Sequence, residues 1–220
     1  MNLLAFDTST QTLGIALSLG DQLFVIEDEG GARTSDILLP RIAELLRQHQ
    51  IELKNIDAIA FGAGPGAFTG LRAAAAATQG MALGANLPVI PIITLQAGAQ
   101  EYLMQHLQEF TDIPAPDILV QLDARMNEWY WAHYQWKDQA WHTLAVPALS
   151  TPEALQTYQE QAHSAKTITI EGTQMHGLVE LAKQAWLRGE TVSAAEALPL
   201  YIRNKVALTT EERIALHAKK

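Results

Sequence analysis

The sequence contains no cysteine among its 220 residues. Disulfide bonds, thiolate metal ligands and cysteine nucleophiles are therefore excluded. The seven histidines never recur at the H-x-x-x-H or H-E-x-x-H spacing by which one helix holds zinc. The G-x-S-x-G turn of serine hydrolases and the G-K-[ST] ending of a P-loop are also missing. These absences disfavour a metal-dependent or nucleophilic enzyme.

Basic residues are few. Lys and Arg number 15 against 24 Asp and Glu, which gives a formal net charge of -9. Clustered Lys and Arg drive binding to nucleic acid, so we expect that this chain does not hold RNA by itself. The one basic stretch is the C-terminal tail, 202–220, with five Lys and Arg residues against two Glu. Such a stretch is also typical of a solvated terminal helix.

Long apolar runs are missing too. Arg72, Gln79 and Asn86 interrupt the most apolar region, which leaves no run near the roughly 18 residues that a membrane span requires. The opening MNLLAFDTST carries no basic leader. We therefore expect a cytoplasmic protein without a membrane anchor. The content of 48% hydrophobic and 18% charged residues is typical of a packed globular protein.

Hydrophobic periodicity predicts strands alternating with helices. The predicted strands cover 3–6, 12–19, 23–26, 56–61, 89–93, 118–122, 128–136, 141–146 and 167–170. The predicted helices cover 34–50, 69–83, 96–107, 152–162 and 178–187. In the first helix, Thr34 or Ser35 is the expected N-cap, and Pro40 requires the helix to start near it or bend there. The order indicates an α/β protein.

Two stretches of the sequence repeat one pattern. LLAFDTSTQTLGIALSLGDQL and ILVQLDARMNEWYWAHYQWKDQA both run strand, Asp, polar turn, strand, turn and strand. This self-similarity predicts a duplicated, two-lobed actin-like (ribonuclease H-like) fold, as in the actin, Hsp70 and sugar-kinase superfamily. We expect lobes at 1–107 and 108–220, the second reduced, with the strand-end residues Asp7 and Asp123 facing each other across a cleft.

Two polar or glycine-rich loops are candidates for contact with a nucleotide. Asp7 and Thr8 offer a carboxylate and a hydroxyl at a strand end, which suits magnesium or phosphate. Gly64 and Gly66 belong to a loop that precedes a helix and can present backbone N–H groups to phosphate. Both loops are equally typical of turns that serve only the fold. The alternative of a purely structural role stays open.

The helix after this loop consists largely of small residues on two faces. Small side chains let helices approach closely, so one face can pack on the sheet and the other on a partner protein. Ordinary packing within the chain explains the same pattern. As a hypothesis, the partner interface comprises Leu38, Leu39, Ile42, Leu46, Thr69, Gly70, Ala73, Ala77 and Gly80.

Four segments, in order, resemble those of the TsaB (YeaZ) family of tRNA threonylcarbamoyladenosine biosynthesis proteins. They are LLAFDTST, GAGPGAFTGLR, DARMNEWYWAHY and PLYIRNKVA. The resemblance implies a degenerate relative of the catalytic subunit TsaD that keeps the fold and lacks the histidine pair that holds metal. No catalytic or metal-ligating residue is then expected in this chain.

The resemblance also implies partners. It implies a heterodimer with TsaD through a bundle of the first two helices, a homodimer through the same surface, and TsaE as a further subunit. The complex transfers threonylcarbamoyl to the adenosine next to the anticodon, so this chain meets tRNA only through the complex. It requires no cofactor itself, and ATP or ADP with magnesium would act at the level of the complex.

Two other functions are compatible with the residues alone. One is an ATP-dependent phosphotransferase or hydrolase with Asp7 as metal ligand and the Gly64–Gly66 loop on phosphate. The other is a stand-alone RNA-binding protein that stacks bases on the aromatics of 129–136 and uses the basic tail.

Overall fold

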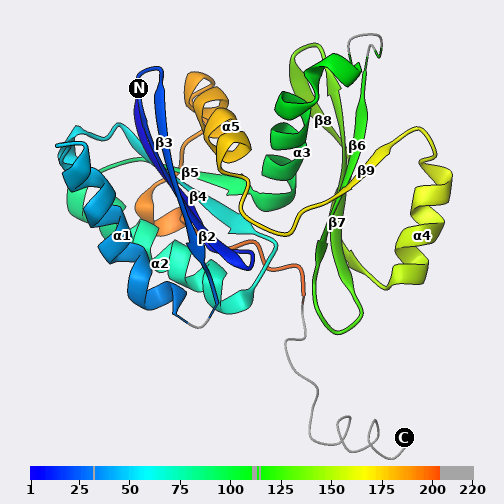
Figure 1. Ribbon diagram of the computed structural model, residues 1–220, viewed down its shortest axis with the longest axis horizontal. Helices are drawn as coiled ribbons and strands as arrows, with labels where there is room; N and C mark the ends of the chain where they lie inside the picture. Colours follow the sequence, from blue (N-terminus) through cyan, green and yellow to red (C-terminus); the bar gives the residue numbers. More distant parts are fainter. Residues whose placement is uncertain (32, 111–112, 114, 204–220) are drawn as a thin grey trace, which may run out of the picture.

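The computed structural model describes residues 1–203 except residues 32, 111, 112 and 114 (Figure 1). Two mixed β-sheets lie next to each other, and helices cover both faces of each. Within this described part, no helix combines the length and apolarity needed to cross a membrane. The basic tail predicted for 202–220 lies outside the described residues except for its first two positions.

The first sheet has the strand order β3-β2-β1-β4-β5. Strands β1 to β3 form an antiparallel meander, whereas β4 and β5 join it in parallel to β1. Strands β4 and β5 each follow a helix, in agreement with the predicted alternation of strands and helices. The bounds are β1 (Asn2–Asp7), β2 (Thr12–Leu19), β3 (Gln22–Glu29), β4 (Ala58–Gly64) and β5 (Val89–Ile93).

The two faces of this sheet bury side chains of different size. Leu4, Phe6 and other large residues pack against α1 (Thr34–Gln48) and α2 (Phe68–Ala85). The opposite face carries Ala5, Ala58 and Ala60 and packs against α5 (Met175–Leu187). Successive residues of a strand point to opposite faces, so this difference is encoded in alternate positions of the sequence. The alanines leave room for α5 to lie close to the sheet.

The second sheet has the order β8-β7-β6-β9, with only β9 parallel to its neighbour. Its strands are β6 (Asp117–Asp123), β7 (Trp129–Lys137), β8 (Ala140–Ser150) and β9 (Lys166–Thr169). One face packs on α3 (Thr94–Gln105), and the other on α4 (Pro152–Gln161).

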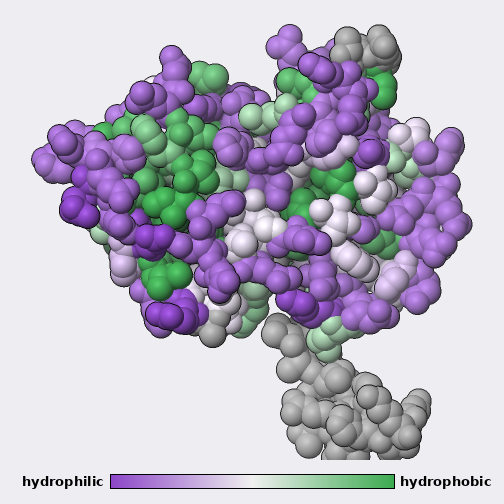
Figure 2. Space-filling view, in the orientation of Figure 1, coloured by the Kyte–Doolittle hydropathy of each residue, from purple (hydrophilic) through white to green (hydrophobic). Residues whose placement is uncertain are grey.

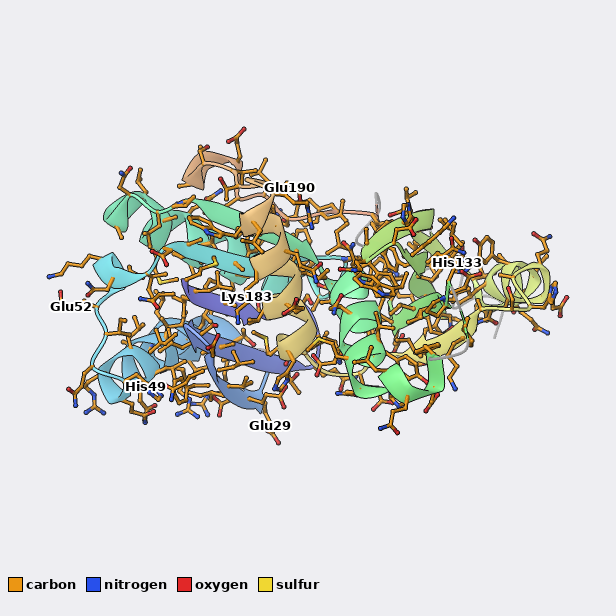
Figure 3. All side chains as sticks on the ribbon, turned by 90° about the horizontal axis from the view of Figure 1, so that it is seen from above. Glu29, His49, Glu52, His133, Lys183 and Glu190 are labelled. Carbon is orange, nitrogen blue, oxygen red and sulfur yellow. The ribbon has the colours of Figure 1, made fainter. Side chains whose placement is uncertain are left out.

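The aromatic strand β7 divides its side chains between these two layers. Tyr130 and Tyr134 are buried on the α3 side. Trp131 and His133 face α4, where His133 Nδ1 lies 3.0 Å from the hydroxyl of Tyr158 (Figure 3). These rings are therefore occupied in packing, which is the structural explanation of the aromatic run.

Helices α3 and α5 tie the two lobes together. Helix α3 precedes residue 107 but packs on the second sheet, whereas α5 follows the second sheet and covers the first. Seen from above, α5, marked by Lys183, lies alongside α3 (Figure 3). The two helices lie so close together that a Cβ on Gly177 would overlap the carbonyl oxygen of Ala97. In addition, Gly177 N–H donates to Glu101 Oε2 at 2.7 Å.

The start of α1 differs from the prediction. Its N-cap is Arg33, which makes no side-chain capping bond, so the expected N-cap role of Thr34 or Ser35 was wrong. The physical reason is a backbone turn, in which Thr34 N–H donates to the carbonyl of Gly31 at 3.2 Å. Helix α1 then runs through Pro40 to Gln48.

Candidate functional site

The polar turn after β1 is closed by its own hydrogen bonds. Asp7 is completely buried, and its Oδ1 accepts the backbone N–H of Ser9 at 2.7 Å. Thr94 donates its hydroxyl to Asp7 Oδ2 at 3.4 Å. The Thr8 hydroxyl donates to the carbonyl of Gly70 at 2.6 Å. Burial raises the pKa of the Asp7 carboxyl, against the opposing effect of its hydrogen bonds with Ser9 and Thr94.

The glycine-rich loop packs directly on this turn. A Cβ on Gly62 would overlap the carboxylate of Asp7. A Cβ on Gly66 would overlap the carbonyl oxygen of Ser9, and one on Gly70 that of Thr8. The glycines therefore admit the backbone of the polar turn at a distance that no side chain would allow. This contact supports the structural explanation that the sequence had left open.

A cavity of about 830 Å³ lies between the two lobes. Ser9 and Thr10 line it from the first lobe, and Asp123 and Trp129 from the second. Residues 198–203, which we name the crossing segment, run along it and contribute Leu200 to Arg203 to its wall. Among the four residues predicted to contact a nucleotide, Gly66 lines the cavity, while Asp7, Thr8 and Gly64 do not.

The two strand-end aspartates are placed differently. Asp123 lies on the cavity wall, as expected, but Asp7 is buried behind Ser9 and does not face it. The carboxylate of Asp123 accepts the backbone N–H of Arg125 at 2.7 Å and lies 3.3 Å from its guanidinium. Both carboxylates thus bond to their own turns. Within the described residues, no group of three His, Asp or Glu side chains is arranged to hold a metal ion.

The second candidate surface is the outer side of α1 and α2. Leu38, Ile42 and Gly70 are buried within the first lobe, so they offer no surface for the partner contact predicted for them. Leu46, Ala73 and Ala77 are partly buried. Leu39, Thr69 and Gly80 are exposed. A Cβ added to Gly80 would meet no other atom within 4 Å.

The exposed part of this surface carries apolar residues. Leu83 is 79% exposed and Leu39 is 50% exposed. Ala76 and Gly84 are also exposed on α2. Figure 2 shows hydrophobic residues gathered on the first lobe, over the strands beside α1. We name Leu39, Ala76, Gly80, Leu83 and Gly84 the outer face. It combines small residues with exposed leucines, as a surface that receives another helix does.

Comparison with known proteins identifies the family. Residues 29–220 match the family model described as TsaD: tRNA N6-adenosine threonylcarbamoyltransferase. The proteins named tRNA threonylcarbamoyladenosine biosynthesis protein TsaB from Haemophilus influenzae and Escherichia coli are each 31% identical to this chain. Both alignments cover 94% of this chain, with 95% and 96% of the relatives. The chain belongs to the TsaB family.

Solved structures agree with this assignment. YeaZ from Pseudomonas aeruginosa matches with a TM-score of 0.73 at 29% identity, over 91% of this chain and 99% of that one. A protein from the same organism described as similar to peptidase YEAZ matches with a TM-score of 0.74 at 30% identity. The predicted two-lobed, actin-like α/β fold of the TsaB family is therefore confirmed. Its second lobe has the smaller sheet, with four strands against five.

The sequence prediction missed two parts of this candidate site. The crossing segment belongs to the family motif PLYIRNKVA and to the start of the basic tail, but neither pattern predicts a contact between the lobes through Tyr201 or Arg203. Ala76, Leu83 and Gly84 were also omitted from the predicted interface. A helical wheel would have grouped them with Gly80, because residues three or four apart share one side of a helix.

The buried carboxyl of Asp7 makes stability depend on pH. Because its folded-state pKa is raised above 3.8, its contribution is full below that pH and is lost as pH rises through the folded-state pKa. Asp7→Asn should therefore raise the melting temperature at pH 7 and reduce the loss of stability between pH 4 and 7. Thermal melts across this range measure both effects. Exposed Asp21→Asn is the control, and an equal response from it would contradict the interpretation.

The glycine contacts predict opposite effects for one substitution at two sites of α2. Gly70→Ala should destabilise the protein by about 1–3 kcal/mol, because the added methyl group overlaps the Thr8 carbonyl. Gly80→Ala should stabilise it by about 1 kcal/mol, because its position is open and alanine favours a helix. Urea unfolding compares the two variants. Equal stability of Gly70→Ala and the wild type would show that the turn and α2 do not need this close contact.

Proposed function

We propose that this chain is a non-catalytic partner subunit that acts with TsaD and TsaE in threonylcarbamoyl transfer to the adenosine next to the anticodon of tRNA. The observation that carries the proposal is the near full-length similarity to proteins named for threonylcarbamoyladenosine biosynthesis. The family model, which is itself described as TsaD, supports TsaD as the partner. We place the protein in the cytoplasm, where tRNA is modified.

The polar turn supports a role without catalysis. A carboxylate that binds magnesium needs free oxygen atoms in contact with solvent or substrate. Asp7 instead accepts bonds from Ser9 and Thr94 in a site without solvent access. The glycine-rich loop packs on that turn and leaves no room between them for phosphate. In this proposal the chain requires no cofactor, and ATP or ADP with magnesium belongs to the complex.

The outer face is the proposed contact with TsaD. It is apolar, it lies on α1 and α2, and two glycines on α2 permit the close approach of a second helix. The same surface would pair two copies of this chain when it is alone, because a face that accepts one amphipathic helix pair can accept another. Contact with tRNA is then indirect, which agrees with the net charge of -9.

Substitutions on the outer face test the contact. Gly80→Trp and Leu83→Glu should weaken association with TsaD at least tenfold, about 1.4 kcal/mol, because they place bulk or charge in an apolar helix contact. Size-exclusion chromatography of the mixture and titration calorimetry give the measurement. Ala154→Trp on α4 and Leu187→Glu on α5 are the matched controls, since both residues are exposed elsewhere. Unchanged binding by both test variants would move the interface away from α2.

The function itself is tested by tRNA modification. Purified TsaD and TsaE, given the threonylcarbamoyl adenylate and tRNA, should form modified adenosine efficiently only when this chain is added. The wild type should restore the reaction, and Gly80→Trp should restore it poorly. If TsaD and TsaE were equally active without this chain, the proposed function would be wrong, whatever the binding measurements had shown.

A further inference from the structure

The crossing segment (residues 198–203) follows a part of the chain that is fixed to the first lobe. Ala197 is fully buried, and its carbonyl accepts a hydrogen bond from Gln79 Nε2 at 3.1 Å. Leu200 N–H then donates to the carbonyl of Ala63 at 2.7 Å. The segment therefore continues the hydrogen bonding of β4 before it leaves the first lobe.

Tyr201 holds the segment to the first turn of α2. Its ring lies 5.5 Å from the ring of Phe68, centroid to centroid. Arg72 donates its Nε–H to the Tyr201 hydroxyl at 3.1 Å and places its guanidinium 3.9 Å from the Phe68 centroid. This cluster anchors the segment to the first lobe through side chains as well as backbone.

Arg203 holds the segment to the second lobe. One of its amino groups donates to the carbonyl of Ala124 at 2.9 Å and pairs with Glu128 at 2.7 Å. Its other amino group lies 2.9 Å from the sulfur of Met126. The Arg203 side chain is only 13% exposed, so this charge is paired in a sheltered position. Ile202 packs against the core of the second sheet.

The crossing segment and the α3–α5 pair lie at opposite ends of the boundary between the lobes. Figure 1 shows α3 and α5 at the upper end and the crossing segment at the lower end. The first turns of these helices are fixed to each other by the close contact of Gly177 with Ala97. A rotation of the lobes about this pair would move the lower end most, where the crossing segment bridges the cavity.

We propose that the crossing segment is a latch that holds the two lobes closed over the cavity, with α3 and α5 as the hinge. The latch has one anchor on each lobe, at Tyr201 and at Arg203, and its own residues form part of the cavity wall. Release of either anchor lets the lobes separate and opens the cavity. This proposal concerns the isolated chain and does not rest on the function proposed above.

Spin labels measure the separation of the lobes. The chain has no cysteine, so Ser35→Cys and Glu153→Cys provide two unique labelling sites. Both positions are exposed, and α1 and α4 both begin at the end of the molecule where the crossing segment lies (Figure 1). Electron spin resonance then gives the distribution of distances between the labels in the full chain.

Arg203→Met removes the second-lobe anchor and keeps the apolar part of the side chain. It should shift the distance distribution to longer values and broaden it. Tyr201→Ala, at a residue that is 46% exposed, should do the same from the other anchor. The matched control is Arg188→Met. It removes an exposed ion pair with Glu190, both of whose residues belong to the first lobe, and should leave the distances unchanged.

Circular dichroism establishes that each variant is folded before the distances are compared. If Arg203→Met does not fold, Tyr201→Ala decides the question, because it truncates a half-exposed ring. Distributions for the folded anchor variants that coincide with the wild type would overturn the proposal. An equal shift in Arg188→Met would also overturn it, because the effect would then not depend on the crossing segment.

Discussion

The close contact between the polar turn after β1 and the glycine-rich loop determines the position of α2. Three glycines meet the carboxylate of Asp7 and the carbonyl oxygens of Thr8 and Ser9, and a larger residue at any of them would push the two loops apart. The first turn of α2 begins at Phe68, directly after this loop, so the same contact positions it. The outer face and the contacts of Tyr201 with Phe68 and Arg72 both depend on the position of α2. The geometry of the outer face and of the crossing segment is therefore determined by packing in the interior.

Local pattern predicted most of the fold. The repeated strand-Asp-turn-strand units, the alternation of strands with helices and the aromatic strand β7 all depend on residue periodicity, which the sequence displays directly. The start of α1 could not be predicted in this way, because a backbone turn at Gly31 replaces the side-chain cap. A backbone hydrogen bond leaves no residue type by which to recognise it.

The candidate sites were predicted less completely. Helix α2 is small and apolar on two faces, so periodicity alone could not decide that Gly70 packs inward and Gly80 outward. The burial of Asp7 depends on Gly62, 55 positions later in the chain, and on Thr94. A turn sequence contains no information on which distant backbone will cover it. In the same way, the sequence around Arg203 does not show that its partners are Ala124 and Glu128, between β6 and β7 of the second sheet.

The exchange of α3 and α5 between the lobes has a consequence for how this chain acquires its structure. The alanine face of the first sheet stays uncovered until α5 has been synthesised, and α5 comes after every strand of the second sheet. During translation, the first half of the chain therefore emerges with one face bare and with the other still lacking Ala197 of its core. Neither half can complete its core alone, so the protein reaches its folded state as a single cooperative unit.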